Sequence, residues 1–221
     1  MTAMPFPYRL YLVISEEACT NHNFLKVAEE AVKGGVDLVQ LREKKDSTSQ
    51  FLNKAIELKK VLDRYHVPLI INDNLEVAIK SGAAGIHVGN TDIPPTDVKK
   101  QWPDCKILGY SIEYLEQLYN EQTYTADYLG ISPVYDTHTK TDTVTTWGIN
   151  GVQEIRSKTE KPLVAIGNMK TENAKKIIEA GADCIAVVSA ICAAQNPLKT
   201  AQLIKQEIDQ GIKNRTAALK F

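Results

Sequence analysis

The sequence predicts one α/β domain over residues 1–221, a single (βα)8 TIM barrel, and three observations lead to this prediction. The chain has 221 residues, of which 43% are hydrophobic, enough to bury one substantial core. Short β-rich runs alternate with amphipathic segments of helical period. At least three times, the end of a predicted helix is followed by a glycine and then by the next predicted strand. This repetition indicates a repeated βα unit.

Eight runs of the sequence are expected to form strands. Because they are almost continuously apolar, both faces of the sheet should be covered, as in a parallel sheet. Eight βα units would close into a barrel, and an open doubly wound sheet is the main alternative. The runs cover residues 8–14, 37–41, 68–72, 84–88, 106–110, 127–131, 162–166 and 183–187.

Helices are expected between most of these strands, with the clearest apolar periodicity at 51–62 and 174–181. Three helix ends carry a glycine suited to the left-handed cap, at Gly34-Gly35, Gly82 and Gly181. From about residue 198 the pattern predicts a final helix. A basic tail with Lys213, Arg215 and Lys220 is expected to follow it in solvent.

Composition excludes several classes of partner. Lys and Arg (26) almost balance Asp and Glu (27), so no global field draws the chain to nucleic acid or to an anionic membrane. The four cysteines lack the spacing of a zinc site, and we expect free thiols in a reducing cytoplasm. No apolar stretch is long enough to cross a bilayer. The oligomeric state stays open, a homo-oligomer included.

The carboxyl end of the second strand carries two cations and an amide. Alternation along a strand sends Gln40, Arg42 and Lys44 to the same side. In a barrel, the carboxyl ends of the strands and the loops after them face one shared pocket. A Lys and Arg pair is otherwise ordinary solvated surface, but at this position it indicates binding of an anion.

Two carboxylates follow the third and fourth strands. Asp73 comes after Asn72, and Asp92 lies just before the next helix, where either aspartate could also serve as a simple helix cap. Beside a cationic second strand, two hard oxygen ligands on neighbouring strand ends predict a Mg²⁺ site next to groups that hold phosphate oxygens.

Later strand ends add hydroxyls, one cation and a glycine. Ser111 follows the fifth strand and could contact a substrate or cap a helix. The loop after the sixth strand is either a phosphate cradle or a solvated connection, with Thr137, Thr139 and Lys140 as the candidates. Gly167 and Ser189 follow the last two strands, where barrels commonly hold a phosphate on backbone N–H groups. Two anion-binding regions would suit two phosphorylated substrates.

These strand ends together resemble the thiamine-phosphate synthase family. The resemblance covers nearly the whole chain, and its specificity comes from seven motifs in order rather than from any one of them. The motifs are Gln40-Leu41-Arg42-Glu43-Lys44, Ile71-Asn72-Asp73, His87-Val88-Gly89-x-x-Asp92, Gly109-x-Ser111, Ser132-Pro133-Val134-Tyr135-x-Thr137-x-Thr139-Lys140, Ala165-Ile166-Gly167 and Val188-Ser189-Ala190-Ile191.

The resemblance implies a (βα)8 barrel and a Mg²⁺-dependent transferase. It would join 4-amino-5-hydroxymethyl-2-methylpyrimidine diphosphate to thiazole phosphate, giving thiamine phosphate and pyrophosphate by a dissociative reaction. The pyrimidine diphosphate site would comprise Gln40, Leu41, Arg42, Glu43, Lys44, Asn72, Ser111 and Lys140. Arg42, Lys44, Ser111 and Lys140 would take part in catalysis. The thiazole phosphate site would comprise Thr137, His138, Thr139, Gly167, Val188 and Ser189. The metal ligands would be Asp73 and Asp92.

The sequence departs from the family pattern at a few positions near the site. Asn168 replaces a second glycine and could narrow the thiazole phosphate site, and Tyr110 could crowd the pyrimidine. Asn74 and Asn90 replace the usual Arg and Gln. Two alternatives stay open: a thiazole tautomerase-like paralogue without metal, which resembles the same scaffold, and a non-catalytic thiamine-precursor binding protein, which the departures at Asn168 and Tyr110 favour. His22, His66 and His87 are interpreted as structural or surface residues.

Overall fold

The computed structural model describes residues 6–137 and 145–218, and in it eight parallel strands form a closed barrel in sequence order. β8 pairs with β1, placing Leu10 opposite Ile185 and Leu12 opposite Val187. The (βα)8 prediction is therefore confirmed, and the open sheet is wrong. The strands are β1 (Leu10–Ile14), β2 (Leu38–Leu41), β3 (Leu69–Asn72), β4 (Gly85–Val88), β5 (Ile107–Ile112), β6 (Tyr128–Ile131), β7 (Leu163–Ala165) and β8 (Cys184–Val187).

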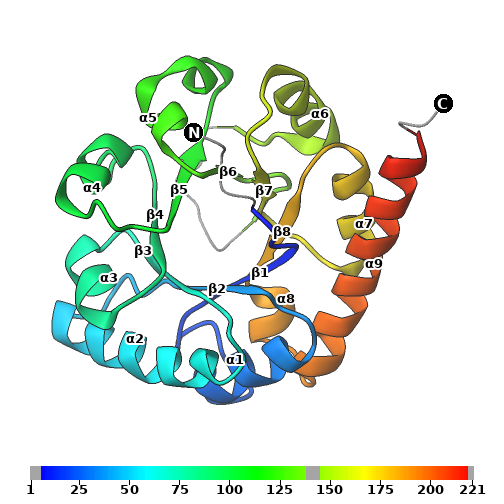
Figure 1. Ribbon diagram of the computed structural model, residues 1–221. Helices are drawn as coiled ribbons and strands as arrows, with labels where there is room; N and C mark the ends of the chain where they lie inside the picture. Colours follow the sequence, from blue (N-terminus) through cyan, green and yellow to red (C-terminus); the bar gives the residue numbers. More distant parts are fainter. Residues whose placement is uncertain (1–5, 138–144, 219–221) are drawn as a thin grey trace.

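Helices surround the barrel, as Figure 1 shows. The expected helix ends are confirmed, because Gly35, Gly82 and Gly181 all have positive φ. Between β5 and β6 the chain forms only a short 3-10 helix and a single turn of α-helix. The helices are α1 (Phe24–Lys33), α2 (Thr48–Asp63), α3 (Leu75–Ser81), α4 (Pro95–Gln101), η1 (Leu115–Tyr119), α5 (Glu121–Thr125), α6 (Gly148–Lys158), α7 (Thr171–Glu179), α8 (Ser189–Cys192) and α9 (Pro197–Ala218).

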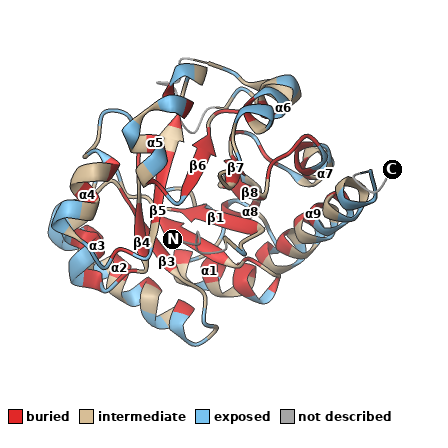
Figure 2. Cartoon of the chain, turned by 45° about the horizontal axis from the view of Figure 1, so that its top comes forward, coloured by how far each residue is buried: buried red, intermediate tan, exposed pale blue. Residues whose placement is uncertain are grey.

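Strand alternation divides the buried side chains into two cores. In β1, the side chains of Leu10, Leu12 and Ile14 pack in the layer between strands and helices. Tyr11 and Val13 belong to a smaller cluster inside the barrel. Figure 2 shows the same division on the whole molecule, with buried strands at the centre and exposed residues on the outer sides of the helices. Inward positions of the strands are therefore the ones that can reach a ligand.

Carboxylates at the start of three strands accept hydrogen bonds from the strand before. The Arg9 N–H donates to Asp37 Oδ1 (2.9 Å) at the start of β2. The Leu108 N–H donates to Asp127 Oδ2 (2.7 Å) before β6, and the Leu163 N–H to Asp183 Oδ2 (3.0 Å) before β8. These contacts satisfy backbone groups at the end of the barrel formed by the strand N-termini.

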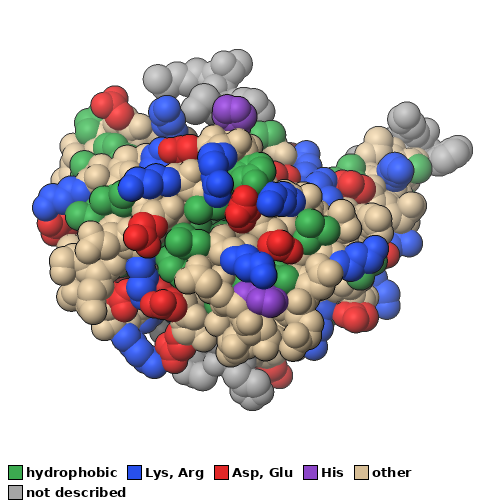
Figure 3. Space-filling view, turned by 90° about the horizontal axis from the view of Figure 1, so that it is seen from below, with side chains coloured by type: hydrophobic (Ala, Val, Ile, Leu, Met, Phe, Trp, Pro, Cys, Tyr) green, Lys and Arg blue, Asp and Glu red, His purple; other side chains and the backbone are tan. Residues whose placement is uncertain are grey.

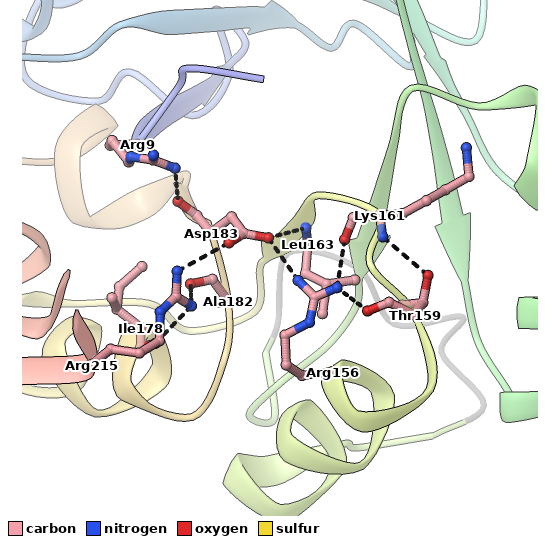
Figure 4. A network of polar contacts seen from close by, with 9 residues as sticks. All are labelled: Arg9, Arg156, Thr159, Lys161, Leu163, Ile178, Ala182, Asp183 and Arg215. Carbon is pink, nitrogen blue, oxygen red and sulfur yellow. Dashed lines mark hydrogen bonds and ion pairs between the residues drawn. The ribbon is translucent and has the colours of Figure 1, made fainter. Parts of the chain in front are cut away.

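Asp183 also gathers three arginines (Figure 4). Arg156 and Arg215 form ion pairs with its two carboxylate oxygens at 2.9 and 3.1 Å, and Arg9 donates to its backbone oxygen at 3.0 Å. We call these four residues the Asp183 cluster. Our expectation of a solvated basic tail is wrong for Arg215, which reaches back from α9 to Asp183, whereas Lys213 is exposed as expected, although it lies within α9, which continues to Ala218. Lys220 lies outside the described residues.

The surface carries both signs of charge. On the face in Figure 3, Lys and Arg side chains are interspersed with Asp and Glu. This mixture agrees with the near balance of charged residues in the sequence. Within the described ranges, no helix has both the length and the apolar character needed to span a membrane.

Candidate active site

One cavity of about 620 Å³ lies at the carboxyl ends of the strands. Strands and the loops after them contribute its walls, including Gln40 from β2, Asn72 from β3, Ser111 from β5 and Val188 after β8. Its size is in the range of cavities that hold small-molecule ligands. Most of the residues that the sequence pointed to therefore meet at a single site.

The cationic wall follows the predicted alternation. Gln40, Arg42 and Lys44 all line the cavity. The side chains of Leu41 and Glu43 lie on the other face: Leu41 is fully buried in the outer core, and Glu43 Oε1 accepts from the Glu16 N–H at 2.8 Å. Any contact of Leu41 or Glu43 with a ligand in the cavity would therefore have to come from their backbone.

Asp73 reaches the cavity through an unusual turn after β3. Its φ is +59°, a left-handed conformation that aspartate tolerates better than most residues. Its carboxylate accepts from Lys44 Nζ at 2.5 Å and from the side-chain amide of Asn72. The helix cap is instead Asn74, whose Oδ1 accepts from the Val77 N–H at 2.9 Å. Asn72 and Asp73 are thus available for other contacts.

Asp92 lies beside Asp73 on the cavity wall. It does not cap α4, where Pro94 occupies the cap position, and it accepts from the Gly89 N–H at 2.8 Å. Burial raises the pKa of the Asp92 carboxyl. The hydrogen bond from Asp92 to Asp73 and the negative charge of Asp73 raise that pKa further. Two carboxylates so close repel each other when both are ionised, and a divalent cation between them would remove this cost.

The donor set fits Mg²⁺ with external ligands. Within residues 6–137 and 145–218, no group of three or more His, Cys, Asp and Glu side chains could hold a metal ion by itself. Mg²⁺ is commonly bound by one or two carboxylates, with waters and substrate phosphates completing its octahedron. Asp73 and Asp92 would supply the carboxylates, and a bound diphosphate would supply further oxygens.

Ser111 contacts a histidine inside the barrel rather than a helix terminus. Its Oγ lies 2.8 Å from His87 Nε2, and His87 Nδ1 lies 2.9 Å from the Tyr128 hydroxyl. All three side chains line the cavity. The interpretation of His87 as a structural or surface residue therefore missed its place in the site. The signal was present, since alternation in β4 directs His87 inward between Ile86 and Val88.

Tyr110 does not crowd the cavity. It points outward from β5 into the layer of side chains beneath the helices, and it is absent from the cavity wall. Its hydroxyl donates to Asn90 Oδ1 at 2.7 Å, and the Gln117 side-chain amide donates to the same oxygen. Two of the departures from the family pattern are therefore in contact, and Tyr110 helps to hold Asn90 at the cavity.

The opposite wall carries the residues expected for a second phosphate. Thr137, Gly167, Val188 and Ser189 line the cavity, together with Asn168. Gly167 has φ +113° and Asn168 has φ +52°, so Asn168 adopts the left-handed conformation that asparagine tolerates. His138, Thr139 and Lys140 lie outside the described residues.

Comparisons with known proteins identify the family. A family model described as thiamine monophosphate synthase matches residues 10–191. A thiamine-phosphate synthase of Albidiferax ferrireducens is 44% identical over 201 residues, covering 91% of this chain and 92% of that protein. One from Leptospira biflexa is 42% identical, covering 90% and 96%.

A solved structure gives the same result for the fold. The thiamine phosphate pyrophosphorylase from Pyrococcus furiosus superimposes with a TM-score of 0.83 at 26% identity, covering 93% of this chain and 98% of that chain. With the family model spanning most of the barrel, and relatives above 40% identity covering nine tenths of the chain, the protein belongs to the thiamine monophosphate synthase family.

Proposed function

We propose that the protein joins 4-amino-5-hydroxymethyl-2-methylpyrimidine diphosphate to 4-methyl-5-(2-phosphooxyethyl)thiazole, giving thiamine phosphate and pyrophosphate. The observation that carries this proposal is one cavity with two walls, each of which would hold a phosphate group, one of them with the help of a metal ion. Arg42, Lys44, Asp73 and Asp92 form one wall, and the segment around Gly167 and Ser189 forms the other. Membership of the family, whose relatives are named for this product, supports the same reaction.

The cationic wall would stabilise the leaving group. In the reaction, the thiazole nitrogen forms a bond to the pyrimidine methylene carbon, and the C–O bond electrons leave with pyrophosphate. Arg42 and Lys44 would face the oxygens on which that charge develops. Bound Mg²⁺ would supply further positive charge to the same oxygens. We assign Asp73 and Asp92 as its protein ligands, since they are the carboxylates that meet beside Lys44.

The other wall would hold and orient the second substrate. Gly167 brings backbone close to the cavity, while Val188 and Ser189 contribute the start of the short helix α8. Holding both substrates in one cavity converts an encounter of two molecules into a reaction within one complex, which accelerates it. The attacking nitrogen belongs to the substrate, so no nucleophile from the protein is needed.

We also propose a reducing cytoplasm as the compartment, with these two small molecules as partners. The four cysteines all lie in the part of the chain that the structure describes, and all are free. Reduced thiols are typical of proteins kept in the cytosol. The proposed site uses one chain only, so a homo-oligomer is compatible with it but not required.

The decisive assay mixes both substrates with the protein and Mg²⁺ and measures thiamine phosphate. We expect product with Mg²⁺ and none with EDTA in excess. Folded protein that forms no product would rule out the synthase and leave a non-catalytic binding protein. Isomerisation of the thiazole phosphate without metal would support the tautomerase-like alternative instead.

The metal assignment has its own test in Asp92→Ala. We expect turnover to fall at least about tenfold, because a ligand of the ion that stabilises the leaving group is lost. Asp97→Ala is the matched control, since Asp97 lies on α4, pairs with Lys100 and does not line the cavity. A near-normal rate in Asp92→Ala, with its fold verified by circular dichroism, would show that the assignment is misplaced.

A further inference from the structure

A continuous chain of hydrogen bonds crosses the inside of the barrel. Gln40 Nε2 donates to the Tyr11 hydroxyl (2.7 Å), which lies 3.0 Å from the Tyr128 hydroxyl. Tyr128 lies 2.9 Å from His87 Nδ1, and His87 Nε2 lies 2.8 Å from Ser111 Oγ. We call these five residues the interior chain. Its two ends, Gln40 and Ser111, both line the cavity.

The Tyr11–Tyr128 bond and the two His87 bonds could each run in either direction by geometry, and the first bond favours one direction for all three. Because the Tyr11 oxygen accepts from Gln40, its own proton is available for Tyr128, and the Tyr128 proton is then available for His87 Nδ1. Tyr11 and Tyr128 are 1% and 0% exposed, so a hydroxyl proton without an acceptor would cost free energy. With Nδ1 accepting, the His87 ring carries its proton on Nε2 and donates it to Ser111.

The packing around His87 and Tyr128 holds this arrangement in place. Their rings stack with centroids 5.5 Å apart. A Cβ added at Gly109 would lie 2.2 Å from Tyr128 Cζ and 2.3 Å from His87 Nδ1, so these rings fill the space left by the glycine. Burial also raises the pKa of the Tyr11 and Tyr128 hydroxyls, which keeps both protonated as donors.

We propose that His87 is a positioning residue, held as its Nε2–H tautomer, and that the interior chain thereby selects an aminopyrimidine. In this state Ser111 keeps its proton for the cavity as a donor, and Gln40 presents its Oε1 as an acceptor. A 4-aminopyrimidine offers the complementary pair, a ring nitrogen that accepts and an amino group that donates. A 4-oxopyrimidine offers the reverse pair, a ring N–H that donates and a carbonyl oxygen that accepts. This inference rests on the proposed function for the identity of the ligand.

The first test reads the tautomer without any substrate. The full-length protein is labelled with ¹⁵N-histidine, and the His87 signals are assigned by their loss in His87→Gln. We expect a protonated Nε2 and an unprotonated Nδ1. Tyr128→Phe removes the proton that Nδ1 accepts, so the preference for Nε2–H should weaken. Tyr8→Phe changes a half-buried tyrosine outside the interior chain, so in this variant the preference for the Nε2–H tautomer should stay unchanged.

The second test measures selectivity by calorimetry in the absence of the thiazole. The ligands are the diphosphates of 4-amino- and 4-oxo-5-hydroxymethyl-2-methylpyrimidine. We expect the ratio of their Kd values to fall at least about tenfold in Tyr128→Phe, which corresponds to one lost hydrogen bond. The ratio should be retained in Tyr8→Phe.

Two further variants keep the inference testable if Tyr128→Phe fails to fold. In His87→Gln the amide nitrogen can take the place of Nε2 and donate to Ser111, so selectivity should be partly retained. The shorter side chain in His87→Asn cannot reach Ser111 to donate this hydrogen bond, so selectivity should be lost.

An Nδ1–H tautomer in the unchanged protein would overturn the inference. So would a Tyr128→Phe variant that folds and keeps both the tautomer and the Kd ratio. Failure to form thiamine phosphate would instead count against the proposed function, because the tautomer measurement uses no substrate.

Discussion

At the scale of single residues, Asp73 combines an unusual backbone with a central position. Its φ of +59° costs free energy in most residues, and such conformations persist where the surrounding structure holds them. Here the turn directs the carboxylate toward Lys44. The residue type thus serves two purposes, because aspartate tolerates the left-handed conformation and also supplies the charge.

Two substitutions separate these purposes. Asp73→Asn tolerates the same φ but lacks the charge, so we expect near-normal stability and at least about tenfold weaker activation by Mg²⁺. Asp73→Ala should also lose about 1–2 kcal/mol of unfolding free energy, because alanine is strained at this φ. Urea unfolding and Mg²⁺ titration of the rate measure the two effects. Equal stability of both variants would contradict the backbone argument.

Gly167 is a second position where backbone geometry sets the site. A Cβ there would lie 2.6 Å from Pro133 Cβ and 2.8 Å from Pro133 Cα, whereas one at Gly148 would meet nothing within 4 Å. Both glycines have positive φ, so Gly148→Ala is the matched control. We expect Gly167→Ala to cost about 1–3 kcal/mol more unfolding free energy than Gly148→Ala. Equal losses in urea unfolding would show that crowding is relieved cheaply.

Residue patterns predicted one wall of the site well. Alternation placed Gln40, Arg42 and Lys44 on the cavity, and they line it. The same rule, applied to β4 and β5, would have placed His87 inward and Tyr110 outward. The contact between Tyr11 and Tyr128 was beyond reach from sequence, because it joins strands 117 positions apart and depends on the register of the closed barrel.

At the scale of elements, the Asp183 cluster ties α6 and α9 to the start of β8. Arg156 comes from α6 and Arg215 from α9, and both meet one carboxylate. Since that carboxylate also accepts from the Leu163 N–H, it joins β7 to the same group. The sequence could not show the contact between Arg215 and Asp183, because a basic segment at the end of a helix resembles a solvated tail. Only the fold places Asp183 beside Arg215.

Removing this carboxylate should destabilise the fold but not the reaction. We expect Asp183→Ala to lower the unfolding free energy by about 2–4 kcal/mol, because two arginines and a backbone N–H lose their partner. Asp209→Ala is the control, since Asp209 is exposed and forms an ordinary (i, i+4) surface pair with Lys205, and it should cost less than about 0.5 kcal/mol. The turnover of folded Asp183→Ala should be unchanged, since Asp183 does not line the cavity. A stability near that of the control would contradict the role of the cluster.

At the scale of the whole molecule, ligand binding and folding are linked through the closed barrel. The cavity draws on residues from most of the strands, so it exists only when the barrel is assembled. A ligand that binds the folded state alone stabilises it by mass action. The proposed site therefore predicts a measurable effect on thermal unfolding.

We expect pyrophosphate and Mg²⁺ together to raise Tm, and EDTA to abolish the rise. At free ligand 100-fold above Kd the gain is about 2.7 kcal/mol, or roughly 5–11 °C for a chain of this length. The Asp92→Ala variant should show a much smaller rise, while the Asp97→Ala control should behave like the unchanged protein. A full rise in the presence of EDTA would show that the anion binds without metal.

The closure of β8 on β1 also bears on how the chain is made. Ile185 pairs beside Leu10, so β1 lacks one neighbour until the chain as far as β8 has left the ribosome. At about 5–20 residues per second, this wait lasts roughly 10–35 s. An open, apolar strand edge invites pairing with other nascent chains during that interval. Shielding of β1 during translation should therefore favour correct closure of this barrel over aggregation.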